Sequence, residues 1–240
     1  MTIRTTLITT GLIAASLSSI LASGAAHAEL QGRDMDGDAL TFEAYYDTDL
    51  DITWLADANY AQTSGYDADG KMDWDTANTW AADLSFTDGV NVYDNWRLPT
   101  VVDPSSLGCI FAYTGTDCGY NVVTANSEMA YLFYVELGNK SYYNTAGVGP
   151  QAGWGLTNTG PFTDLQADYY WSGTELASNT SFAWLFFFYN GSQLPYTEVN
   201  GFYALAVSPG DVGAVPEADT WAMLLAGLGL VGAATRRRRG

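Results

Sequence analysis

The segment Phe182-Ala183-Trp184-Leu185-Phe186-Phe187-Phe188-Tyr189-Asn190-Gly191 indicates how the body of this chain folds. Its first eight residues are apolar or aromatic, a composition typical of a β-strand. The Asn-Gly pair that follows favours a tight turn and so the start of a hairpin. Two further segments, Tyr169–Trp171 and Phe202–Val207, have the same strand-like composition. The sequence therefore predicts a small, mostly antiparallel sheet in this half of the chain.

The first half of the body offers two more strands. Leu40 to Tyr46 alternates apolar and polar residues, and Ile52 to Leu55 is a short run of strand-forming residues. Residues 94–124 and 147–160 are rich in loop-forming residues and are expected to be long loops.

Two helices are expected. Asp73 to Leu84 has an aspartate that can cap its first turn and apolar residues at helical spacing. In Ser127 to Leu137, Ser127 is the natural N-cap and Gly138 is placed to end the helix. The predicted fold class is α+β, with two helices, a small mostly antiparallel sheet and long loops.

The N-terminus has the features of an export signal. An apolar segment from Leu7 to Leu21 precedes Ala26-His27-Ala28, the small-x-small pattern that signal peptidase cleaves. Cleavage is expected between Ala28 and Glu29, which makes residues 1–28 a signal peptide.

The C-terminus has the features of a second targeting signal. Val215-Pro216-Glu217 precedes an apolar run from Trp221 to Ala234, and Arg236-Arg237-Arg238-Arg239 follow it. A stable membrane span needs about 20 apolar residues, so this run is short for one. Positive residues stay on the cytoplasmic side, so the body is expected to face the outside of the inner membrane.

The body between these ends is strongly acidic. Between Glu29 and Val215 lie 25 acidic and four basic residues, a net charge of −21. Such a charge repels nucleic acid and anionic lipid headgroups. It suits a cation, a cationic partner or a calcium-rich matrix, or else it serves only to keep the protein soluble.

The residue inventory also limits catalysis. The only histidine, His27, leaves with the signal peptide, which excludes histidine-dependent nucleophilic catalysis and histidine-ligated zinc. Acid–base chemistry would then need a pair of carboxylates, and Glu175 is one candidate without a defined partner. The protein is expected not to be an enzyme, with a carboxylate-dependent hydrolase of matrix polysaccharide as the alternative.

The two cysteines, Cys109 and Cys118, are expected to form a disulfide, because an even count in an exported chain is typical of one. Closing so short a loop stabilises the fold by about 2–3 kcal/mol in the chain-entropy model.

Two aspartate-rich segments are candidates for calcium, which prefers oxygen ligands. Neither matches the spacing of an EF-hand loop, and polar turns explain the same composition. The candidate ligands are Asp67, Asp69, Asp73 and Asp75 in one segment and Asp34, Asp36 and Asp38 in the other. No other cofactor is expected.

Aromatic residues divide into two expected roles. Four tryptophans among apolar strand residues are expected in the core: Trp54, Trp96, Trp171 and Trp184. Six tyrosines either pack on strands or contact a glycan or a protein: Tyr142, Tyr143, Tyr169, Tyr189, Tyr196 and Tyr203. Arg97, one of the few cations, is expected to anchor a buried or half-buried ion pair.

The C-terminal residues resemble the PEP-CTERM sorting signal of Gram-negative bacteria. The resemblance rests on Val215-Pro216-Glu217, Thr220, the apolar run and the arginine cluster, while Ala218 replaces the usual second proline. It implies that an exosortase-type membrane protease cuts near Pro216-Glu217 and that the body goes to the cell surface or the exopolysaccharide matrix.

The body resembles the Lcl C-terminal domain family, whose function is unknown. The most specific matching strings are Trp96-Arg97-Leu98-Pro99-Thr100 and Trp171-Ser172-Gly173-Thr174-Glu175, and the match spans roughly residues 43–211. The resemblance implies a fold similar to C-type lectins and the formylglycine-generating enzyme, and a binding or adhesion module. It implies no particular site residue. Ser208 departs from the family pattern, which has an arginine there.

These observations give one set of expectations. Residues 1–28 are a signal peptide, residues 29–213 form the domain, and residues 214–240 form the sorting signal with a short membrane segment at 221–234. The protein is expected to pass the inner membrane transiently and then to bind a glycan, a matrix polymer or a surface protein outside the cell. A purely structural matrix protein is the remaining alternative.

Overall fold

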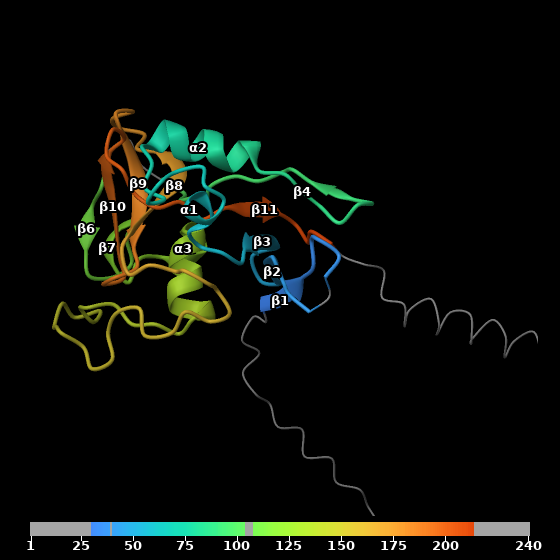
Figure 1. The fold of residues 1–240 in the computed structure, drawn as a ribbon. Helices are drawn as coiled ribbons and strands as arrows, with labels where there is room; N and C mark the ends of the chain where they lie inside the picture. The colour runs from blue at the N-terminus through green and yellow to red at the C-terminus, as the bar shows by residue number, and fades with distance from the viewer. Residues whose placement is uncertain (1–29, 39, 104–107, 214–240) are drawn as a thin grey trace, which may run out of the picture.

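The computed structural model describes residues 30–38, 40–103 and 108–213. Within these residues, the β-structure consists of two larger sheets and one small hairpin (Figure 1). The four-stranded sheet has the order β1-β2-β3-β11, and the five-stranded sheet has the order β6-β7-β10-β9-β8. All neighbours are antiparallel except β6 and β7, which are parallel. The α+β class is confirmed, but the single expected sheet is replaced by three.

The strands of the four-stranded sheet are β1 (Leu30–Arg33), β2 (Ala44–Asp47), β3 (Ile52–Leu55) and β11 (Val207–Pro209). Those of the five-stranded sheet are β6 (Phe111–Ala112), β7 (Cys118–Tyr120), β8 (Tyr169–Glu175), β9 (Phe182–Phe187) and β10 (Ser192–Thr197). The small hairpin pairs β4 (Phe86–Thr87) with β5 (Val92–Tyr93).

The helices are α1 (Tyr60–Thr63), α2 (Trp74–Asp83) and α3 (Glu128–Tyr131), which a π-helical turn, η2 (Leu132–Glu136), continues; η1 (Thr124–Asn126) is a 3-10 turn. Both predicted helices are confirmed, including their caps. The Asp73 carboxylate accepts from the Thr76 amide, and the Ser127 hydroxyl accepts from the Ala130 amide. Gly138 follows with a positive φ of 61°, which favours glycine at the end of a helix.

The position of β9 between buried clusters explains why its sequence is apolar without alternation. Ala183 and Leu185 face the cluster that α2 covers, while Phe186 faces the cluster around α3. Trp184 lies in a third cluster beside the disulfide. Because both faces of the strand are buried, a polar residue has no exposed face to occupy. The predicted hairpin after β9 is confirmed, with Gly191 at a φ of 72°.

Two expected strands are wrong in extent. Leu40 to Tyr46 becomes a strand only from Ala44, because the Asp38 carboxylate accepts from the Leu40 amide and holds this part in a turn. Leu40 is 92% exposed. β1, which pairs with β2, was not expected from the sequence.

The segment from Phe202 to Val207 passes between elements instead of forming one strand. Phe202 bridges Met72, Tyr203 bridges Tyr170, and only Val207 begins β11. Ala204 to Ala206 are buried, so their apolar character reflects the core between the sheets. Apolar composition alone does not distinguish a β-strand from a buried segment that crosses the core.

The predicted ion pair of Arg97 is confirmed, and the segment around it contacts three elements, α3, β11 and β8. Its guanidinium binds both carboxylate oxygens of Glu128, each at 2.8 Å. The Arg97 backbone exchanges two hydrogen bonds of 2.8 Å with Val207 of β11. Glu128, at the start of α3, also accepts from the Thr100 amide, and the Gly173 amide of β8 donates to the Pro99 carbonyl.

We expect Arg97→Met to lower the free energy of unfolding by about 2 kcal/mol, because it leaves a half-buried carboxylate without its bidentate partner. Lys71→Met is the matched control, since Lys71 donates one hydrogen bond to Asp168 instead of two to a carboxylate, and both side chains are 33% exposed. Its expected cost is below about 1 kcal/mol. Urea denaturation of the exported protein measures both, and equal losses would contradict a special role for Arg97.

Candidate functional site

A pocket of about 400 Å³ lies beside the four-stranded sheet. Four aromatic rings line it: Phe42, Tyr45, Tyr60 and Phe86. The buried residues Leu55 and Ala56, at and after the end of β3, add apolar surface. Its volume is in the range of sites for small ligands or single side chains.

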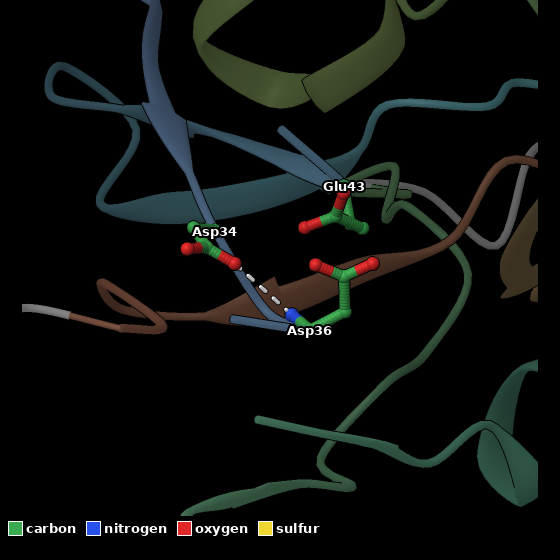
Figure 2. Close-up of side chains that lie close together, drawn as sticks. All are labelled: Asp34, Asp36 and Glu43. Atoms are coloured by element: carbon green, nitrogen blue, oxygen red, sulfur yellow. Dashed lines mark hydrogen bonds between the residues drawn. The ribbon is translucent and has the colours of Figure 1, made fainter. Parts of the chain in front are cut away.

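Carboxylates give this pocket its charge. Asp36, Glu43 and Asp57 line it, and Asp34 lies next to them. One carboxylate oxygen of Asp34, one of Asp36 and one of Glu43 all lie within 4.8 Å of one another. Figure 2 shows the carboxylates of Asp36 and Glu43 turned toward each other. In the described part of the chain none of the four carboxylates is in an ion pair.

The backbone of the hairpin between β1 and β2 brings these groups together. The Asp34 carboxylate accepts from the amides of Asp36 and Gly37, which closes a turn with Gly37 at a φ of 88°. The Glu43 carboxylate accepts from the Met35 amide at 2.8 Å across the hairpin. Sequence reasoning missed Glu43, because its place depends on the register of an unexpected strand.

The second aspartate segment forms the same turn but no cluster. The Asp67 carboxylate accepts from the amides of Asp69 and Gly70, and hydrogen bonding to these amides lowers the pKa of Asp67. Asp73 is occupied as the cap of α2, and Asp75 lies in the first turn of that helix. Among the described residues this segment contributes no group of three carboxylates close enough to share an ion.

The calcium hypothesis therefore stays a prediction, narrowed to Asp34 and Asp36 with Glu43. Asp38 is outside the group, and its carboxylate accepts from the Leu40 amide instead. Polar turns explain the aspartate pattern in both segments.

A second set of acidic residues lies between β2 and η2. Asp47 is fully buried, and its carboxylate accepts from the Asp49 and Leu50 amides and from the Trp54 indole. Burial raises the pKa of Glu136 to about 7, and the nearby Asp47 and Asp49 add to the shift. One oxygen of Glu136 is buried without a hydrogen-bond partner.

A third set lies where β8 and β10 end. Burial raises the pKa of Glu198, and the neighbouring carboxylates of Glu175 and Asp75 raise it further. Glu175 is exposed, and one oxygen of Glu198 is buried without a hydrogen-bond partner. Sequence reasoning named Glu175 but gave it no partner, because Glu198 approaches it only through the sheet.

Aromatic side chains form a continuous surface strip, here called the aromatic band. Each ring lies 3.8–6.2 Å from the next, measured between centroids. No member is fully buried. The band runs through Phe111, Tyr113, Tyr120, Tyr143, Tyr142, Trp154, Tyr189, Phe187, Tyr169, Phe202 and Tyr196.

The tryptophans and the tyrosines named from the sequence occupy different places in the structure. The four tryptophans predicted for the core are at most 4% exposed. Five of the six tyrosines lie in the aromatic band, and the sixth, Tyr203, stacks on Tyr170 beneath the Lys71 ammonium. The expected disulfide is also confirmed, with the Cα atoms of Cys109 and Cys118 5.3 Å apart.

Comparison with known families assigns the body. The family model described as "Lcl C-terminal domain" matches residues 43–208. The chain belongs to the Lcl C-terminal domain family. Arg97, which joins β11 to α3, lies within the matched region, and Ser208 is buried in β11 opposite Thr53. No curated protein and no solved structure matches the chain.

The sorting signal is assigned in the same way. The model described as "PEP-CTERM protein-sorting motif" matches residues 214–239. The expected signal cleavage between Ala28 and Glu29, the motif Val215 to Glu217 and the segment 221–234 lie outside the described residues. Among the helices that the structure does describe, none has the length and apolar character of a membrane span.

Glu136 gives a prediction for stability against pH. Its folded pKa lies above its unfolded value, so folding favours the protonated form and stability falls as pH rises through about 7. We expect Glu136→Gln to be about 1 kcal/mol more stable than the parent at about pH 8, and similar to it near pH 4.5, after allowance for partial exposure.

Thermal unfolding of the exported protein at a series of pH values measures this difference. Asp83→Asn, at the exposed end of α2, is the control for loss of one negative charge. If Glu136→Gln destabilises the protein at pH 8, or if both variants change alike, the Glu136 carboxylate does not carry the pH dependence.

Proposed function

We propose that this protein is a binding module of the cell surface or exopolysaccharide matrix, and that the aromatic band is its contact surface. The sorting motif at residues 214–239 supports export to the cell surface or the extracellular space. An exosortase-type protease would cut near Pro216-Glu217 after a transient stage at the inner membrane, and signal peptidase would cut before Glu29.

The observation that carries the proposal is the exposure of the band. Tyr189 is 49% exposed, Phe111 is 59% exposed, and Tyr113 and Tyr196 are 40% and 41% exposed. A tyrosine offers a flat apolar face and a hydroxyl at its tip, a combination enriched at interfaces. Contacts between neighbouring rings hold each one in place, so little side-chain freedom is lost on binding.

The charge of the body favours a neutral polysaccharide as the ligand. A net charge of −21 repels sulfated and other anionic polymers at low ionic strength. Sugar rings can stack on aromatic faces without any charge, and the band extends over several strands and loops. A long neutral polymer can therefore contact several rings at once.

We expect Tyr189→Ala and Tyr196→Ala each to weaken binding to a neutral oligosaccharide by about fivefold to tenfold, in line with losing one stacked ring. Tyr66→Ala is the matched control, because Tyr66 is also 49% exposed and lies outside the band. An array of neutral and sulfated oligosaccharides measures binding by the parent and all three variants.

Preference for the sulfated members, or an equal loss in the Tyr66 variant, would contradict the role of the band. Absence of binding to every member would favour the purely structural matrix protein.

The third acidic set supports a second candidate function, a carboxylate-dependent hydrolase. Glu198 has a raised pKa beside Glu175, and a pair of carboxyl groups in different environments is what a glycoside hydrolase needs. In this alternative Glu198 is the general acid and Glu175 is the base or nucleophile.

Release of reducing ends from matrix polysaccharide tests this alternative. If the protein is a hydrolase, Glu175→Gln and Glu198→Gln each reduce the rate by about 100-fold or more, while Asp83→Asn leaves it unchanged. We expect no release by the parent protein, because binding is the proposed function.

A further inference from the structure

The pocket beside the four-stranded sheet combines two features that together select a cation. Its aromatic walls come from two sides. Phe42 and Tyr45 contact each other at 6.3 Å between ring centroids, and Tyr60 and Phe86 contact each other at 5.4 Å. Aromatic faces attract organic cations through the negative charge density of the ring.

The position of Phe42 depends on a residue without a side chain. Gly32 of β1 pairs with Tyr45, and a methyl group added at Gly32 would collide with the Phe42 ring. The ring therefore lies directly over the strand backbone beside the pocket, although it is 49% exposed. The aromatic wall is set by the sheet and does not need a ligand to form.

The second feature is uncompensated negative charge. Asp36, Glu43 and Asp57 line the same space, and Asp34 adds a fourth carboxylate at its edge. Arg33, Lys71 and Arg97 are each paired elsewhere, with Asp211, Asp168 and Glu128. Within the described part of the chain, no cation lies in the pocket lining.

We propose that this pocket binds the side chain of a lysine presented by a protein outside the cell. The rings and the apolar floor fit the aliphatic stem, and the carboxylates accept from the ammonium group, which has three donors and no acceptor. A neutral sugar is less suited, because it would leave the negative charge of Asp36, Glu43 and Asp57 uncompensated, whereas an ammonium group neutralises part of it. This site is separate from the aromatic band, and its test is independent of the glycan test.

A titration with two matched probes tests the proposal on the exported protein. Nα-acetyl-lysine methylamide carries the ammonium group, and Nα-acetyl-norleucine methylamide has the same stem without it. We expect the lysine probe to bind at least about tenfold more tightly, and its binding to weaken as NaCl rises from about 50 to 500 mM.

Two aspartate variants distinguish the effect of a charge in the pocket lining from the effect of the protein's overall negative charge. Asp36→Asn removes a charge from the lining and keeps an oxygen that can accept from the Asp38 amide, as Asp36 does now. Asp38→Asn removes the same charge two residues away, outside the carboxylate group. We expect the first to weaken the lysine probe by about fivefold or more and the second by less than about twofold.

Three results would overturn the proposal. One is equal binding of the lysine and norleucine probes, and another is an equal effect of the two aspartate variants. The third is preferential binding of glucosamine or of calcium alone over the lysine probe, which would assign the pocket to an amino sugar or a metal ion. Thermal unfolding of each variant confirms that a loss of binding is not a loss of fold.

Discussion

The bidentate ion pair between Arg97 and Glu128 is the constraint on which the arrangement of this protein depends. The short segment Arg97–Thr100 contacts β11 through its backbone, α3 through the ion pair and β8 through the Pro99 carbonyl. The two larger sheets share no strand, so contacts of this kind hold them in one orientation. An arginine suits this role because its planar guanidinium fixes the direction of a carboxylate as well as its distance.

Internal ion pairing also determines the charge of the surface that remains for binding. Three of the four cations in the body form internal ion pairs, so most of the acidic side chains remain uncompensated. The five-stranded sheet and the loops beside it carry the aromatic band, and the hairpin of β1 and β2 carries three clustered carboxylates at the acidic pocket (Figure 2 shows these carboxylates). One region thus offers neutral stacking surfaces, and the other offers negative charge within aromatic walls.

Local signals in the sequence predicted the longer helices and several strands, but not β1, α1 or the short strands β4 to β7, two of which (β6 and β7) lie where a long loop was expected. Strand β3, the hairpin after β9, the caps Asp73 and Ser127, the disulfide and the pairing of Arg97 all follow from residue type and short spacing. The errors arose where the same composition serves two purposes. Leu40 to Tyr46 looks like a strand but begins as an aspartate-held turn, and Phe202 to Val207 is apolar because it crosses the core.

The sites were harder to predict than the elements, because they join residues that are distant along the chain. Glu43 approaches Asp34 and Asp36 only through the register of β1 on β2, and Glu198 approaches Glu175 only across the five-stranded sheet. The tyrosines of the aromatic band were named as candidates, but nothing in the sequence placed Phe111 next to Tyr120 or Trp154 next to Tyr189.

The most direct test of the account is hydrogen–deuterium exchange on the exported protein, with and without the matrix isolated from the bacteria that produce it. If the aromatic band is the contact surface, the matrix slows exchange in residues 142–154 and 187–196 and leaves α2 unchanged. Protection confined to α2 or to the segment from Asp67 to Asp73, with none in the band, would contradict the account.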